Sequence, residues 1–197
     1  GEVQESDSVW QDLLFVGQVL AEVKVTPKFC RQQVEKLVLT YLGLDTDFDD
    51  EPTQQLLKQL RGIETFNHQV LERLQQAAED ECLSEEQHNR ALVAMLYVVC
   101  GEAGETLTDY ITAIVQQLTP SLFSKIRNLV AELGAEMTPV LERGLEGRSL
   151  DAEQRQALEF MTGLSYLRAE QYDRAIARLQ PLVDQEDCRL DGFIQWA

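Results

Sequence analysis

The stretch "GLSYLRAEQYDRAIARL", residues 163–179, decides the fold that the sequence predicts. It sets a glycine and a tyrosine three residues apart in one segment, and a tyrosine and an alanine three residues apart in the next. The small residues Gly163 and Ala175 would let two helices approach closely, and the rings of Tyr166 and Tyr172 would fill the groove beside them. The stretch therefore predicts a tightly packed helix pair.

Residues 156–189 resemble one tetratricopeptide repeat (TPR), a helix–turn–helix unit of 34 residues. Counted from Gln156, the positions that match the family pattern are Gly163 at the eighth, Tyr166 at the eleventh, Tyr172 at the seventeenth and Ala175 at the twentieth. The departures are Thr162 where the family favours Leu, Glu170 where it favours Gly in the turn, Pro181 inside the second helix, and the lack of a proline near Asp187.

The resemblance implies a concave groove that is lined by the first helix of each pair and takes a peptide or helix of a partner protein. It implies partner contacts at Glu159, Arg168 and Gln171, of which the last two lie near the groove rim or turn. It implies packing roles for Phe160, Gly163, Tyr166, Tyr172 and Ala175.

A further repeat is expected to begin near residue 190. Ala197 stands 34 residues after Gly163, and Phe193 and Trp196 precede it where the repeat has large apolar side chains. We therefore expect residues 151–197 to form a TPR-like unit that continues in a longer solenoid. Residues 1–150 are expected to form a divergent N-terminal helical domain, which would include degenerate TPR-like hairpins.

Helix start and stop signals recur along the chain and predict about ten antiparallel helices with no strand. Apolar residues follow one another at steps of three and four from Val9 to Val23, which predicts an amphipathic helix. A short helix is expected over 138–145, and Gly144 and Gly147 at its end mark the expected domain boundary. The predicted caps are Thr26 before Pro27, Thr119 before Pro120, Ser84 with Gln87, and Asp151 with Gln154. The class is all-α, either a helical bundle or an α-solenoid of TPR-like hairpins.

The chain is strongly acidic, with 34 Asp and Glu against 17 Lys and Arg and a formal net charge of −17. This charge disfavours binding to nucleic acid and to anionic lipid. It leaves two alternatives open, a surface that is acidic only for solubility and a basic protein partner. The longest apolar run, "ALVAMLYVVC" at 91–100, is too short for a membrane span and is expected to form a central core helix.

The four cysteines are widely separated, which favours a reducing, cytoplasmic compartment over a disulfide framework. The acidic loop "DTDFDDE" at 45–51 has the first acidic positions of a calcium loop but lacks its glycine and its final glutamate, so a solvated loop is favoured. His68, His88 and Cys82 would form a metal site only through a fold contact that the sequence does not show. We expect no catalytic residue, no cofactor and no metal site.

Three functions remain open on this reading. A non-catalytic scaffold or adaptor that binds a partner peptide or helix is favoured by the TPR resemblance. A regulatory or oligomerisation domain of a larger enzyme is the first alternative. An acidic helical chaperone for a basic client is the second, and it is supported by the net charge alone.

Overall fold

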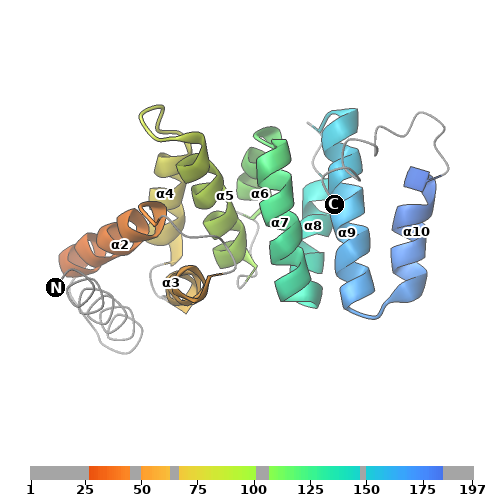
Figure 1. The fold of residues 1–197 in the computed structure, drawn as a ribbon, viewed down its shortest axis with the longest axis horizontal. Coiled ribbons are helices and arrows are strands. Elements are labelled where there is room, and N and C mark those ends of the chain that lie inside the picture. The colour runs from red at the N-terminus through yellow and green to blue at the C-terminus, as the bar shows by residue number, and fades with distance from the viewer. Residues whose placement is uncertain (1–26, 45–49, 63–66, 101–106, 147–149, 184–197) are drawn as a thin grey trace. The chain divides into compact units, whose positions relative to one another are not determined.

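The computed structural model of the chain describes residues 27–44, 50–62, 67–100, 107–146 and 150–183 (Figure 1). These residues form helices, turns and short connections without any strand, so the predicted all-α class is confirmed for them. The expectations for the helix at Val9–Val23, for the loop at 45–49, for Gly147, and for Phe193 and Trp196 lie outside the described residues.

The described chain divides into two compact units between Val98 and Val99. The helices of the first unit are α2 (Pro27–Leu42), α3 (Glu51–Gly62), α4 (Asn67–Ala78) and α5 (Glu85–Val99). The second unit contains α6 (Leu107–Gln116), α7 (Pro120–Leu133), the 3₁₀ turn η2 (Gly134–Met137), α8 (Thr138–Leu145), α9 (Ala152–Arg168) and α10 (Tyr172–Val183).

Three of the predicted helix starts are confirmed by hydrogen bonds that cap the first turn. The Ser84 and Gln87 pair caps α5, with the Ser84 amide donating to Gln87 Oε1 over 3.0 Å. The Asp151 and Gln154 pair caps α9, with the Gln154 amide donating to Asp151 Oδ1 over 2.8 Å. Thr119 caps α7 by accepting a hydrogen bond from the Leu122 amide over 3.2 Å, and Pro120 is the first residue of the helix, as expected.

The core of the first unit takes fully buried apolar side chains from all four helices, among them Leu57 of α3 and Leu74 of α4. In α2, which packs against α3 and α4, Leu37 and Val38 are fully buried. Residues 91–99 of α5 are all buried, which confirms the expected central position of this helix in the core. The hydroxyl of Tyr41 donates to the carbonyl of Arg90 over 3.3 Å and so joins α2 to α5.

The second unit is a stack of helices in two layers. Within it α7 packs against α9, while α6 packs against α8, so alternate helices lie side by side in the same layer. Figure 1 shows α7 and α9 next to each other with α6 and α8 behind them. Helix α9 also packs against α8 and α10, which makes it the central helix of the stack.

Close helix contacts in this unit depend on glycine. A Cβ on the buried Gly163 of α9 would lie 2.5 Å from Leu179 Cδ2 of α10, and Ala175 of α10 is 2 % exposed. Gly163 and Ala175 therefore allow α9 and α10 to approach as closely as the sequence predicts.

Gly144 has a different role from the one expected of it. A Cβ there would lie 2.7 Å from Cγ2 of Ile111 in α6, so this glycine is a buried contact within α8. The boundary expected at residue 150 falls inside the second unit, where α8 and α9 pack together.

Candidate functional site

A groove lies between α7 and α9, and its lining is more apolar than that of the two other hollows described below. It encloses about 610 Å³ and is called here the α7–α9 groove. Its lining residues are Arg127, Asn128, Val130 and Ala131 from α7, Leu164, Leu167 and Arg168 from α9, and Tyr172 from the start of α10.

Helical spacing places these side chains on the two facing surfaces. In α9, Leu167 and Arg168 lie three and four residues after Leu164, so both are on the helix face that carries Leu164. On the same helix Gly163 and Tyr166 are buried. The groove therefore uses the part of α9 that its neighbours α8 and α10 leave open.

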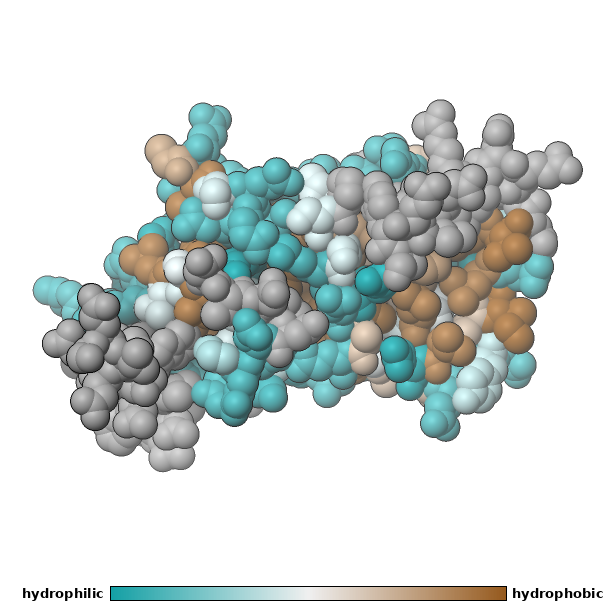
Figure 2. Space-filling model, in the orientation of Figure 1, coloured by the Kyte–Doolittle hydropathy of each residue, from teal (hydrophilic) through white to brown (hydrophobic). Residues whose placement is uncertain are grey.

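Apolar side chains in the groove are exposed to an unusual degree. Leu167 is 45 % exposed and Tyr172 is 57 % exposed. Figure 2 shows hydrophobic surface over α9 and α10. Ile176 and Val183 of α10 are also exposed, by 59 % and 72 %. Exposed large apolar side chains on neighbouring helices are typical of a surface that another chain covers.

The charge of the groove is opposite in sign to that of the chain. Two of its lining residues, Arg127 and Arg168, are basic, and none of the described lining residues is acidic. Arg168 is in the last turn of α9, where a cation is favoured by the helix dipole. The groove thus combines an apolar floor with two guanidinium groups.

The structure brings only part of the predicted partner site together. Arg168 lines the groove. Gln171 lies in the turn that follows, where its Oε1 accepts from Arg174 Nη1 over 3.2 Å, and it lines a separate shallow hollow with Glu170 and Asp173. Glu159 is half-buried on α9 two turns before Arg168 and is not among the groove's lining residues.

The lining residues of α7, together with Leu164 and Leu167, are absent from the sequence-based site. Leu164 could have been found because it lies four residues before Arg168, and Leu167 because it lies three residues after Leu164, since residues three and four apart share a helix face. The α7 residues could not, since residues 121–150 lack the tyrosine and alanine positions of the repeat. Tyr172 was expected to pack, but its 57 % exposure shows that it does not do so within the described chain.

Tyr166 packs as predicted and also anchors a polar cluster. It is 3 % exposed, and its hydroxyl donates to the carboxylate of Glu142 in α8. Burial, reinforced by this hydrogen bond, raises the pKa of Tyr166 above its ordinary value. Arg174 lies 5.6 Å from the centre of the tyrosine ring, and Arg178 Nη2 lies 3.9 Å from Glu142 Oε1, so the cluster joins α8, α9 and α10.

Phe160, the remaining residue with a predicted packing role, contacts α7. Its ring centroid is 6.0 Å from that of the fully buried Phe123, with the ring planes tilted by 33°. This distance is within the range of favourable aromatic pairs. The pair links α7 to α9 and so stabilises the two helices that form the groove.

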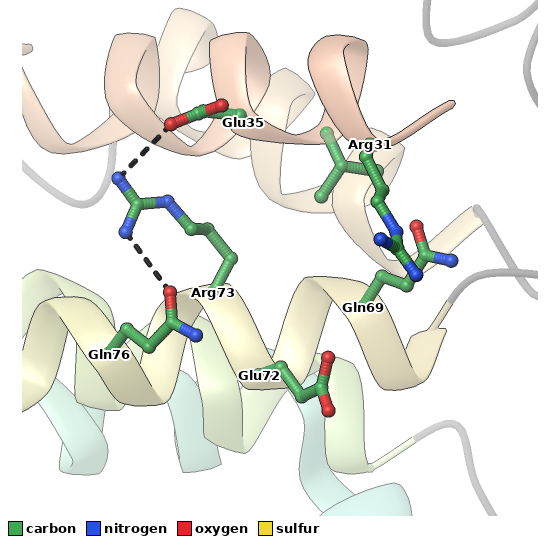
Figure 3. Close-up of a pocket in the computed structure, with 7 residues that line it drawn as sticks. Arg31, Glu35, Gln69, Glu72, Arg73 and Gln76 are labelled. Carbon is green, nitrogen blue, oxygen red and sulfur yellow. Dashed lines mark hydrogen bonds and ion pairs between the residues drawn. The ribbon is translucent and has the colours of Figure 1, made fainter. Parts of the chain in front are cut away.

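A second cleft, of about 370 Å³, lies in the first unit between α2 and α4 (Figure 3). Arg73 of α4 crosses it, with Nη2 3.6 Å from Glu35 Oε1 and Nη1 donating to Gln76 Oε1 over 3.3 Å. The lining is completed by Arg31, Val34, Gln69 and Glu72. The two basic and two acidic side chains that line this cleft cancel in formal charge, and Arg73 already pairs with Glu35. The cleft is therefore less selective for the charge of a partner than the α7–α9 groove is.

The residues considered for a metal site are not brought together. His68 Nε2 lies 3.2 Å from Glu72 Oε1, while His88 Nε2 is 2.6 Å from the carbonyl oxygen of Asp80. No group of three or more His, Cys, Asp or Glu side chains that could hold a metal ion occurs among the described residues. Cys30, Cys82 and Cys100 are free thiols, and Cys188 lies outside the described residues.

None of the helices in the described part of the chain is both long enough and apolar enough to cross a membrane. Comparison with protein families, with curated proteins and with solved structures finds no significant match to this chain. The assignment of the candidate site therefore depends on the geometry of the structure alone.

Proposed function

We propose that this chain is a non-catalytic protein-interaction module of TPR-like type, which binds a peptide or helix of a partner protein in the α7–α9 groove. The observation that carries the proposal is the open apolar floor of this groove, with Leu167 45 % exposed beside Tyr172. Burial of such side chains drives most protein association, and a partner would cover them. The free cysteines favour a reducing, cytoplasmic setting for this role.

The helix arrangement supports the TPR-like part of the proposal. In stacked helix hairpins the first helices pack on one another and the second helices do the same, which produces an extended binding surface. The second unit has this pattern, with α7 on α9 and α6 on α8. The groove is formed between two such first helices, as the resemblance of residues 156–189 implies.

The proposal is tested by selecting ligands from a random peptide library displayed on phage, with the whole chain as bait. Selected peptides are then measured by fluorescence anisotropy against Leu167→Asp and against Leu39→Asp. Leu39 of α2 is 51 % exposed, so it matches Leu167 in residue type and exposure but lies in the other unit. We expect Leu167→Asp to weaken binding by about tenfold or more, as loss of a central apolar contact does.

Leu39→Asp is expected to bind the same peptides as the unmodified chain does. If Leu167→Asp binds as well as Leu39→Asp, or if selection enriches no peptide that competes for the groove, the groove is not a binding site and the proposal fails. Circular dichroism of both variants separates loss of binding from loss of helix.

One alternative, a regulatory or oligomerisation domain of a larger enzyme, is favoured by the outer face of α10. Tyr172, Ile176 and Val183 lie at intervals of four and seven residues and are all exposed, so one apolar stripe of this helix is uncovered. Sedimentation equilibrium tests this alternative. Self-association that Ile176→Glu abolishes would support it, and a monomer at all concentrations would remove it.

A further inference from the structure

The lining of the α7–α9 groove specifies the chemistry of its occupant. The whole chain carries a formal charge of −17, yet the described lining residues include two arginines and no carboxylate. The remaining lining residues are apolar or aromatic except for Asn128. The groove is thus a locally basic, apolar site on an acidic protein.

Arg168 is positioned to receive an anionic group from outside the chain. It is exposed, and it makes no ion pair or hydrogen bond with any residue that the structure describes. Its stem is close to the end of α7, because a Cβ on Gly134 would lie 3.5 Å from Arg168 Cβ. The side chain of Arg168 therefore begins beside the end of α7, at the edge of the groove, and no described residue neutralises its charge.

The contrast with Arg73 in the first unit shows what Arg168 lacks. Arg73 lies 3.6 Å from the carboxylate of Glu35 and also donates to Gln76, so its charge is used within the chain (Figure 3). Arg73 thus contacts one carboxylate oxygen and one amide oxygen, and an arginine can also pair with both oxygens of a carboxylate at once. No carboxylate among the described residues pairs with Arg168 in this way.

We infer that the partner segment is amphipathic and acidic, with Asp or Glu side chains next to large apolar ones. This inference rests on the proposed function. The apolar side chains would cover Leu164, Leu167 and Tyr172, while a carboxylate pairs with Arg168. A basic segment, which the net charge alone would attract, meets two like charges in the groove, and such juxtaposition opposes binding and specifies the partner.

The test uses the peptides selected from the phage library and a reversal of charge at Arg168. Asp and Glu are expected to be enriched beside Leu, Phe, Ile or Trp in these peptides. Arg168→Glu is expected to weaken their binding about tenfold, and replacing the pairing Glu of the peptide by Lys is expected to restore affinity for this variant. Arg31→Glu is the matched control, since it makes the same change of charge at an exposed α2 arginine outside the groove.

The outcomes separate this inference from the proposed function. Peptides that need Leu167 but carry no acidic residue, or that bind equally to Arg168→Glu and Arg31→Glu, overturn the inference and leave the groove as a binding site. Peptides enriched in Lys and Arg overturn it in favour of a basic partner. Failure to select any peptide that needs Leu167 overturns the proposed function itself.

Discussion

The backbone amide of Gln171 donates to the carbonyl of Tyr166 over 2.9 Å, and this bond closes the C-terminal end of α9. The Glu170 amide also donates to the Leu167 carbonyl over 3.1 Å. The two bonds together form a Schellman motif, in which the first of the two donor residues is usually glycine. Here Glu170 occupies that position with φ of 58°. The turn that joins α9 to α10 is therefore strained at one residue.

Glu170→Gly is expected to stabilise the chain. Glycine adopts this left-handed conformation without the clash of a Cβ, although it also gives the unfolded chain more freedom, so the net gain is about 0.5 to 1 kcal/mol. Urea denaturation followed by circular dichroism measures it. Glu170→Ala is the control, because it removes the same carboxylate without relieving the strain, and equal stability of the two variants would contradict the explanation.

Gly163→Ala is expected to destabilise the chain by about 1 to 3 kcal/mol, because the added methyl group overpacks the contact between α9 and α10. The clash is with Cγ and Cδ2 of Leu179, both 2.5 Å from the added Cβ. Gly62→Ala is the matched control, since a Cβ there meets nothing within 4 Å.

In that control the free energy of unfolding should be unchanged or should rise by at most about 1 kcal/mol, the helix preference of alanine over glycine. The double variant Gly163→Ala with Leu179→Ala should recover part of the loss, because the shorter side chain removes the clash. If Gly163→Ala is as stable as Gly62→Ala, the close approach of the two helices is not required for the fold.

Stability is expected to fall as the pH rises above about 10, the ordinary pKa of tyrosine. Burial raises the pKa of Tyr41 far above this value, so the folded chain retains a proton that the unfolded chain releases. The contribution of Tyr41 is therefore complete below pH 10 and declines above it, by about 1.4 kcal/mol per pH unit.

Tyr41→Phe removes this decline, so the variant should lose less stability than the unmodified chain between about pH 10 and pH 11. The variant also loses the hydrogen bond to the Arg90 carbonyl, which lowers its stability at neutral pH by about 1 kcal/mol. Tyr172→Phe provides the comparison because Tyr172 is 57 % exposed. Parallel stability profiles for the two variants above pH 10 would show that Tyr41 is not held protonated by the fold.

Local features of the fold could be predicted from the sequence because their causes are local. The caps at Ser84, Thr119 and Asp151 depend on a side chain and an amide within one helical turn, and each is present as expected. Gly163 and Ala175 could be assigned from the repeat pattern, since that pattern encodes contacts between neighbouring helices.

Features that depend on distant segments could not be predicted in the same way. Gly144 was assigned to a boundary because glycine ends helices as often as it permits close contacts, and only the position of Ile111 distinguishes the two roles. Only part of the groove could be predicted, because Arg168 lies in the helix pair that the sequence predicts over residues 156–189, while Arg127 lines the same groove through the packing of α7 on α9. The net charge likewise leaves open either a surface that is acidic for solubility or a basic partner, whereas the local lining supports the acidic partner that we infer.

Hydrogen exchange measured by mass spectrometry, with and without a peptide selected on the whole chain, tests the central claim most directly. We predict slower amide exchange in the groove-lining parts of α7 and α9, around residues 127–131 and 164–168. Protection of α2 and α4 around Arg31 and Arg73, with α7 and α9 unchanged, would contradict the claim and would assign binding to the cleft of the first unit.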